Sequence, residues 1–239
     1  MTASDRSSTC RCVVSFMAAI SLLATSCAEP LDADEPSDVA LSGVGVVAEG
    51  CGLAKSVGSG VVVDRGDGEA VVVTAAHTIK GATGVVVVDA DGNENMARVV
   101  AFDKDADLAA LTVIGLAAPA VEVTTNPVSV VEGASGSILT WGRDDGVEEV
   151  PVVITKRLLV TIEDIYVDDV IERTALELAG PVAVGDSGGP VLDEAGDVVG
   201  IVYANSRGRE QVGFATDQVE VAALLAAVGS ATVANGTCA

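Results

Sequence analysis

The chain has 239 residues, of which 49% are apolar but only 3% aromatic, and its formal net charge is −22 at pH 7. That charge argues against a nucleic-acid-binding protein and against docking on an anionic membrane through protein charge alone. His77 is the single histidine, so a multi-histidine metal site is excluded. The length allows one large domain or two small ones, and the abundant valine favours strands over helices.

Residues 1–26 have the layout of an export signal, in which Arg6 and Arg11 precede a mostly apolar stretch. This stretch, residues 12–24, is shorter than the roughly twenty residues that a membrane-spanning helix needs. It ends in Leu22-Leu23-Ala24-Thr25-Ser26-Cys27, which resembles a bacterial lipobox with the leucine one place further upstream than usual. Lipidation of Cys27 and plain secretion after cleavage near Ala28 are the two alternatives. Both predict an exported protein, either a cell-envelope lipoprotein or a secreted one.

Residues 27–42 are rich in Asp and Glu and lack apolar periodicity, so they predict an acidic disordered linker before a domain at 43–239. If Cys27 carries lipid, the membrane is contacted only through that anchor. Cys51 and Cys238 are then an even set in an oxidising compartment, which predicts a disulfide between them. Two free thiols are the alternative.

From Cys51 onward, short valine-rich runs are separated by Gly and Asp turn signals, and this predicts an all-β domain of the sandwich or paired-barrel type. The expected strands are residues 59–63, 70–75, 84–89, 97–102, 108–114, 137–141, 150–160, 174–178, 198–203 and 211–214. The first four form two hairpins, with turns at 64–68 and 91–92. Only residues 217–227 have a helical pattern, with Asp217 as the expected N-cap.

Gly185-Asp186-Ser187-Gly188-Gly189-Pro190 carries the strongest chemical signal in the chain. A nucleophilic serine needs backbone N–H groups directed at the oxyanion, and a glycine-flanked turn allows Gly185 and Ser187 to supply them. A simple glycine turn between strands is the alternative, but the hexapeptide resembles the signature of trypsin-like (chymotrypsin-fold) serine proteases. The resemblance implies two six-stranded antiparallel β-barrels with a C-terminal helix.

A serine hydroxyl needs a base, and the only imidazole is His77 in Thr74-Ala75-Ala76-His77, which resembles the second signature of the family. The carboxylate that orients the imidazole is sought among Asp103, Asp105 and Asp107, which share one face if the strand is regular. Asp107 directly precedes an apolar run, as the family's aspartate does, so Asp107 is assigned and Asp105 is the fallback. The order His77, Asp107, Ser187 is that of chymotrypsin-type proteases.

The resemblance runs from about Gly58 to Val228 and points to bacterial exported proteases of the trypsin-like and HtrA-like kind, here without a PDZ domain. Cys51 and Cys238 flank the domain as cysteines do in actinobacterial periplasmic acid-resistance proteases. No Ile-Val-Gly-Gly-like segment is present to form a zymogen's new N-terminus. The group that pairs with Asp186 is therefore left open.

Relatives that cleave after Lys or Arg carry an aspartate six residues before the nucleophile, where this chain has Pro181, so tryptic specificity is not expected. The resemblance implies that Pro181, Tyr203, Ala204 and Phe214 line the substrate pocket, which favours small or apolar side chains. It also implies a monomeric endopeptidase that acts on protein or peptide substrates with no metal or cofactor. A latent or non-catalytic surface binding module that keeps the fold is the alternative function.

Overall fold

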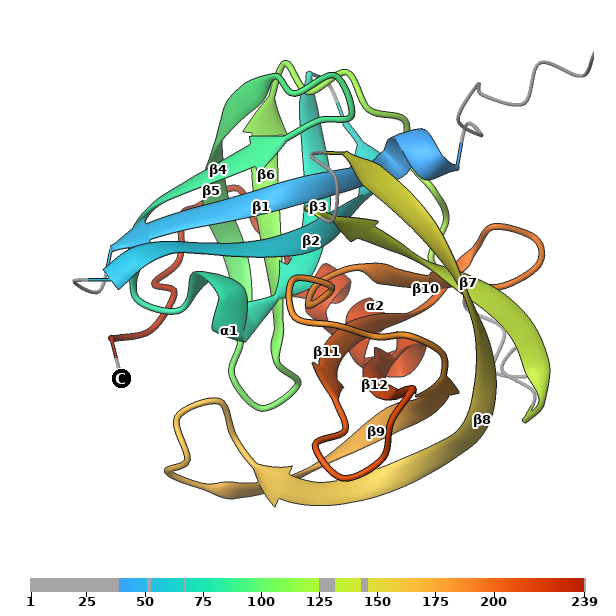
Figure 1. Ribbon diagram of the computed structural model, residues 1–239. Helices are drawn as coiled ribbons and strands as arrows, with labels where there is room; N and C mark the ends of the chain where they lie inside the picture. The colour runs from blue at the N-terminus through green and yellow to red at the C-terminus, as the bar shows by residue number, and fades with distance from the viewer. Residues whose placement is uncertain (1–38, 51–52, 67, 125–131, 143–145, 239) are drawn as a thin grey trace, which may run out of the picture. The chain divides into compact units, whose positions relative to one another are not determined.

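The computed structural model describes residues 39–50, 53–66, 68–124, 132–142 and 146–238. These residues form two closed antiparallel β-barrels of six strands each (Figure 1). The predicted all-β, two-barrel fold is confirmed. Within the described ranges, no helix has the length and apolar character needed to span a lipid bilayer.

The first barrel is built from the N-terminal strands in the order β1-β2-β3-β6-β5-β4, and it closes because β4 pairs back with β1. Its strands are β1 (Gly43–Gly50), β2 (Leu53–Arg65), β3 (Glu69–Ala75), β4 (Ala82–Val88), β5 (Glu94–Asp103) and β6 (Leu108–Ile114). The two predicted hairpins are confirmed as the antiparallel pairs β2–β3 and β4–β5. One helical turn, α1 (Ala76–Ile79), directly follows β3.

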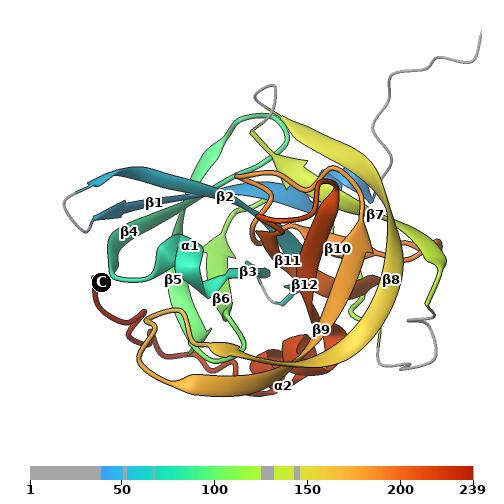
Figure 2. The same ribbon diagram turned by 60° about the horizontal axis from the view of Figure 1, so that its bottom comes forward.

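The second barrel has the order β10-β11-β12-β9-β8-β7 and closes where β10 pairs with β7. Its strands are β7 (Ala134–Trp141), β8 (Val147–Glu163), β9 (Val170–Ala179), β10 (Pro190–Leu192), β11 (Val198–Asn205) and β12 (Val212–Asp217). The predicted C-terminal helix is confirmed as α2 (Gln218–Ala226), and the Asp217 side chain accepts the Val219 N–H as its N-cap. Figure 2 shows α2 beside both barrels, where it packs on β5 and β6 as well as on β11 and β12.

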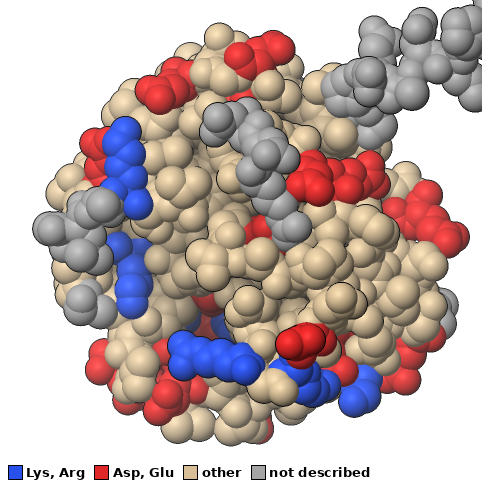
Figure 3. Space-filling model, in the orientation of Figure 1, with Lys and Arg blue, Asp and Glu red and all other residues tan. Residues whose placement is uncertain are grey.

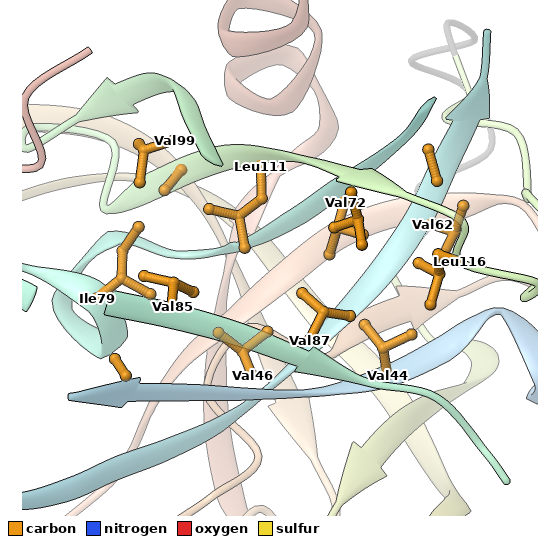
Figure 4. Close-up of a cluster of buried hydrophobic side chains, with 14 of the residues drawn as sticks. Val44, Val46, Val62, Val72, Ile79, Val85, Val87, Val99, Leu111 and Leu116 are labelled. Atoms are coloured by element: carbon orange, nitrogen blue, oxygen red, sulfur yellow. The ribbon is translucent and has the colours of Figure 1, made fainter. Parts of the chain in front are cut away.

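The continuous valine runs are explained by strands that are buried on both faces. Val62 and Val72 point into the first barrel, where they join the cluster shown in Figure 4. Their neighbours Val61 and Val73 belong to a second cluster, which also includes Leu139 of β7 together with residues of β11 and α2. Because successive side chains of a strand alternate between its faces, an unbroken apolar run places one face in the barrel and the other against its partner.

The sequence did not predict β1, β10 or α1, and residues 39–42 differ from the expected linker. The 3-10 helix Ala40–Ser42 precedes β1, and Ser42 is fully buried. Glycine in a sequence usually indicates a turn, but Gly45 lies within β1, where a Cβ would be 2.6 Å from the Trp141 ring. The absence of a side chain at this position therefore lets the two barrels pack closely. β10 is only three residues long and begins with Pro190, which makes it too short for a pattern to show.

Candidate active site

Asp107 holds His77 through both its ring and its backbone. The Nδ1 atom of His77 lies 2.8 Å from Asp107 Oδ2, and the His77 N–H donates to Asp107 Oδ1 at 2.9 Å. The Ala76 N–H donates to the carbonyl oxygen of Asp107 at 3.1 Å, so α1 is attached to the residue before β6 at three points. Because a carboxylate only accepts hydrogen bonds, this contact favours the tautomer of a neutral imidazole that has its proton on Nδ1 and its acceptor at Nε2.

The three candidate aspartates do not share one face of a strand, because β5 ends at Asp103 and β6 begins at Leu108. The Asp103 carboxylate accepts the N–H of Asp105 at 2.9 Å and stabilises the turn between the two strands. The side chain of Asp105 is 54% exposed, whereas that of Asp107 is 5% exposed. Of the three, Asp107 is the one whose carboxylate contacts His77.

Ser187 lies on a tight turn between the second barrel's β9 and β10. Gly185 and Gly188 on either side of it have φ values of +100° and +90°, a region that favours glycine. A Cβ on Gly188 would also collide with the carbonyl oxygen of Ser59 and the hydroxyl of Thr74. The glycines of the hexapeptide are therefore required both by the turn and by its contact with the first barrel.

Asp186 is 1% exposed, and its Oδ2 accepts the Ala183 N–H at 2.7 Å. The Asp186 N–H in turn donates to the Ala183 carbonyl at 3.3 Å, and the Gly189 N–H donates to the Asp186 carbonyl at 2.9 Å. One partner of the buried carboxylate is therefore the backbone of its own loop.

His77, Gly185 and Ser187 line one cavity of about 360 Å³, although the motifs that carry them are more than a hundred residues apart. Within the described ranges, neither the Gly185 N–H nor the Ser187 N–H has a hydrogen-bond acceptor. The cavity thus brings together an imidazole, a serine hydroxyl and two residues with unused backbone donors. This combination suits attack on a carbonyl carbon with stabilisation of the resulting oxyanion.

Two of the four predicted pocket residues, Tyr203 and Ala204, line this cavity, and Pro181 and Phe214 are not among its lining residues. Phe214 stacks behind Tyr203, with ring centroids 6.3 Å apart. Burial raises the pKa of the Tyr203 phenol, and the Arg173 guanidinium, which lies 4.0 Å from the centre of the ring, acts in the opposite direction. Tyr203 therefore presents a neutral aromatic wall to the cavity.

The lining of the cavity is less acidic than the chain as a whole. On the face shown in Figure 3, basic residues lie along the left and lower margins, and Asp and Glu lie there as well as at the top and right. No Asp or Glu is among the described residues that line the cavity, and Arg207 is. Val57 and Val184, which also line it, are 48% and 96% exposed, so apolar side chains flank the predicted nucleophile.

A larger cavity of about 560 Å³ lies elsewhere on the second barrel, among β7, β8 and the β10–β11 turn. It contains none of the predicted catalytic residues. In the described part of the chain, no group of three or more His, Cys, Asp or Glu side chains is arranged to hold a metal ion.

Several predicted features lie outside the described residues, namely the signal at 1–26, the linker up to residue 38, Cys27 and Cys51. Cys238 lies within the described residues, whereas its predicted partner Cys51 does not. Sequence reasoning missed several residues at the site, including the lining residues Val57, Val184 and Arg207 and the buried Ser59. Ser59 was assigned only as the start of a strand, yet it contacts the turn that carries Ser187. A weak signal was present in the small-residue run Gly58-Ser59-Gly60, since such runs allow close backbone approach.

Comparison with known proteins finds serine proteases among the relatives of this chain. Serine protease Rv3671c of Mycobacterium tuberculosis is 31% identical over 169 residues, which cover 70% of this chain and 42% of that protein. Serine protease Do-like HtrA of Lactobacillus helveticus is 29% identical over 146 residues, which cover 61% of this chain and 35% of that protein. The chain therefore spans less than half the length of the curated relatives it matches.

The fold agrees with that of a solved structure. The crystal structure of the Rv3671c protease from M. tuberculosis, active form, matches with a TM-score of 0.76 at 28% sequence identity, over 84% of this chain and 86% of that one. A family model described as a trypsin-like peptidase domain matches residues 58–201, which is more than half of the 239 residues and includes His77, Asp107 and Ser187. The chain therefore belongs to the family of trypsin-like peptidase domains.

Proposed function

We propose that this protein is a serine endopeptidase in which Ser187 is the nucleophile, His77 the general base and acid, and Asp107 the orienting carboxylate. The observation that carries the proposal is the 2.8 Å contact between His77 Nδ1 and Asp107 Oδ2, beside a cavity that Ser187 also lines. Membership in the trypsin-like family supports the same reaction class.

The reaction follows from the roles of these atoms. Nε2 of His77 takes the proton of the Ser187 hydroxyl while Oγ bonds to the carbonyl carbon of the scissile peptide. The electron pair of the C=O bond moves onto oxygen, where the N–H groups of Gly185 and Ser187 stabilise it. When the C–N bond breaks, the leaving amine takes the proton from His77 and an acyl-enzyme remains. Water then repeats the sequence and releases the carboxylic acid.

Fluorophosphonate labelling of the purified protein tests this proposal, with intact mass and peptide mapping as the readouts. We expect one adduct, on Ser187, and no adduct in Ser187→Ala. His77→Ala should slow labelling by several orders of magnitude, because the serine then has no base. If a well-folded wild-type protein takes no adduct, the domain is latent or is a non-catalytic binding module that keeps the fold.

We further propose that the substrates are proteins or peptides with a small or apolar side chain before the scissile bond. Tyr203, Ala204 and the exposed Val184 support this, because each adds a neutral and mostly apolar side chain to the lining of the cavity. Cleavage-site profiling on a peptide mixture tests it. Cleavage mainly after Lys, Arg, Asp or Glu would contradict it.

We also propose that the protein is exported, that residues 1–26 are removed, and that Cys51 pairs with Cys238. Cleavage before Cys27 with lipidation predicts recovery in the membrane fraction, and Cys27→Ala should release the protein. Cleavage near Ala28 predicts recovery in the medium. Peptide mapping with and without reductant should identify a Cys51–Cys238 cross-link, and recovery of two free thiols would exclude it.

A further inference from the structure

Every polar group of Ser59, which lies in the first barrel, makes a hydrogen bond. Two of these bonds reach the turn that carries Ser187, and the other two reach Trp141 and Thr74. The Ser59 hydroxyl donates to the Gly185 carbonyl at 2.9 Å and accepts a hydrogen bond from the backbone N–H of Trp141 at 2.8 Å. Its own N–H donates to the Ser187 carbonyl at 2.8 Å, and its carbonyl accepts the Thr74 hydroxyl at 2.7 Å. Ser59 is 1% exposed and is not among the residues that line the active-site cavity, so a direct contact with substrate is not expected.

The two carbonyls that Ser59 holds belong to Gly185 and Ser187, the same residues whose N–H groups would bind the oxyanion. A hydrogen bond on each carbonyl restricts rotation of the peptide plane that follows the residue, and thereby the path of the backbone on both sides of Asp186. Gly185 has a φ of +100° and no Cβ, so its own side chain sets no barrier to other conformations. The restraint on this turn has to come from neighbours.

We propose that Ser59 is a positioning residue, whose hydroxyl and N–H hold the Gly185 and Ser187 carbonyls against the first barrel and so keep the N–H groups of those residues ready for the oxyanion. The proposal rests on the serine protease function above and deepens it. Preorganised donors stabilise the transition state because they need no rearrangement when charge develops. Ser59 should therefore affect the chemical step more than the binding of substrate.

The test is the rate of Ser187 modification by a fluorophosphonate, measured over a range of reagent concentrations in wild type and in Ser59→Ala. We expect the maximal rate to fall by about 10- to 100-fold, which is a smaller fall than removal of an oxyanion donor causes. The reagent concentration that gives half the maximal rate should stay unchanged. The pH midpoint of labelling should also stay unchanged, because His77 and Asp107 keep their contacts. If Ser59 only stabilised the fold, the maximal rate would not fall while half-saturation and the pH midpoint stay unchanged.

Ser42→Ala is the matched control. Like Ser59, Ser42 is buried, and it lies in the 3-10 helix that precedes β1. Its hydroxyl donates to the backbone carbonyl of Val39 at 2.6 Å. It does not contact the Ser187 turn, so Ser42→Ala should label within about twofold of the wild-type rate, while losing a hydrogen bond of the same kind. An equal slowing in both variants would show a general loss of stability and would overturn the proposal.

Ser59→Cys covers the case in which Ser59→Ala does not fold. A thiol is a weaker hydrogen-bond donor than a hydroxyl, in a side chain of similar shape. The labelling rate of Ser59→Cys should therefore be lower than that of wild type, and higher than that of Ser59→Ala where both variants fold. A folded Ser59→Cys or Ser59→Ala that labels at the wild-type rate overturns the proposal. So does a change confined to half-saturation. These outcomes require a wild type that labels, whereas failure of the serine protease function itself would appear as a wild type that does not.

Discussion

At the scale of single residues, the conformation of Asp107 explains how one carboxylate can hold both the ring and the backbone of His77. Its φ is +56°, in the left-handed region, where Asp and Asn are among the few non-glycine residues that occur regularly. This conformation directs the side chain and the carbonyl of Asp107 toward the same short helix, α1. Because asparagine tolerates the same backbone conformation, replacing Asp107 by asparagine changes the chemistry of the contact and preserves the fold.

We therefore expect Asp107→Asn to lower the rate of Ser187 labelling by about three to four orders of magnitude, because an amide stabilises the wrong imidazole tautomer. Asp105→Asn is the matched control, since its side chain is 54% exposed and does not contact His77. Its rate should stay within about threefold of wild type. The measurement is the same fluorophosphonate reaction, with circular dichroism to verify folding. The reverse pattern would assign the orienting role to Asp105.

The residues that short motifs carry were predictable, and those that only the fold brings together were not. His77 and Ser187 stand in local signatures and Asp107 precedes an apolar strand, so the sequence and its family resemblance could select all three as candidates. Ser59 is 126 residues from Gly185 and 82 residues from Trp141, the two backbone partners of its hydroxyl. Nothing local marks a serine whose partners lie on other strands and loops.

At the scale of elements, the end of β12 and the start of α2 depend on one buried carboxylate. Asp217 caps α2, and its fully buried side chain accepts two hydrogen bonds from Arg157 of β8, at 2.7 and 3.0 Å. The Asp N-cap was visible in the sequence, whereas the arginine sixty residues earlier was not. In the same way, β1 was missed because its glycines, which allow the barrels to pack closely, resemble turn residues.

Asp217→Ala should lower the free energy of unfolding by about 3–5 kcal/mol, because it removes the helix cap and leaves the Arg157 guanidinium without its buried partner. Urea denaturation followed by circular dichroism measures this change. Glu49→Ala is the control, because Glu49 pairs with Lys55 at 2.9 Å on the surface, with 57% of its side chain exposed. The urea midpoint of that variant should stay close to wild type. Equal shifts in the two variants would contradict the importance assigned to Asp217.

At the scale of the whole molecule, the position of Asp107, the proposed orienting carboxylate, depends on contacts between the two barrels. The turn that precedes Asp107 belongs to the first barrel, but the second barrel holds it at several points. The Thr216 hydroxyl of β12 donates to the Ala106 carbonyl at 3.0 Å, and Arg173 of β9 donates to the Asp105 carbonyl at 3.2 Å. Lys104 donates to Asp164, which directly follows β8, at 2.6 Å. The position of the proposed triad is therefore a property of the barrel pair, which no single motif could predict.

The Lys104–Asp164 contact predicts how stability changes in acid. The hydrogen bond from Lys104 lowers the pKa of Asp164 from 3.8 to about 2, with help from the N–H groups of Asp168 and Tyr166 and against the effect of burial. Because this pKa is lower in the folded chain than in the unfolded one, the contact stabilises fully above about pH 4 and is lost as the pH falls toward 2. Asp105 and Asp169 also contact the Lys104 ammonium, at 3.1 and 3.2 Å, and lose the same partner when it is replaced.

We expect Lys104→Met to have a lower melting temperature than wild type at pH 6. We expect this difference to shrink between pH 4 and pH 2, where protonation of Asp164 ends, in the wild type, the contact that the variant already lacks. Calorimetry across that range measures it. Lys55→Met, which loses only the surface pair with Glu49, should differ little from wild type at any pH. A Lys104→Met difference that stays constant from pH 6 to pH 2 would mean that the lysine acts through packing of its aliphatic chain. The charge of Asp164 would then have no part in joining the barrels, and the turn before Asp107 would depend on Thr216 and Arg173 instead.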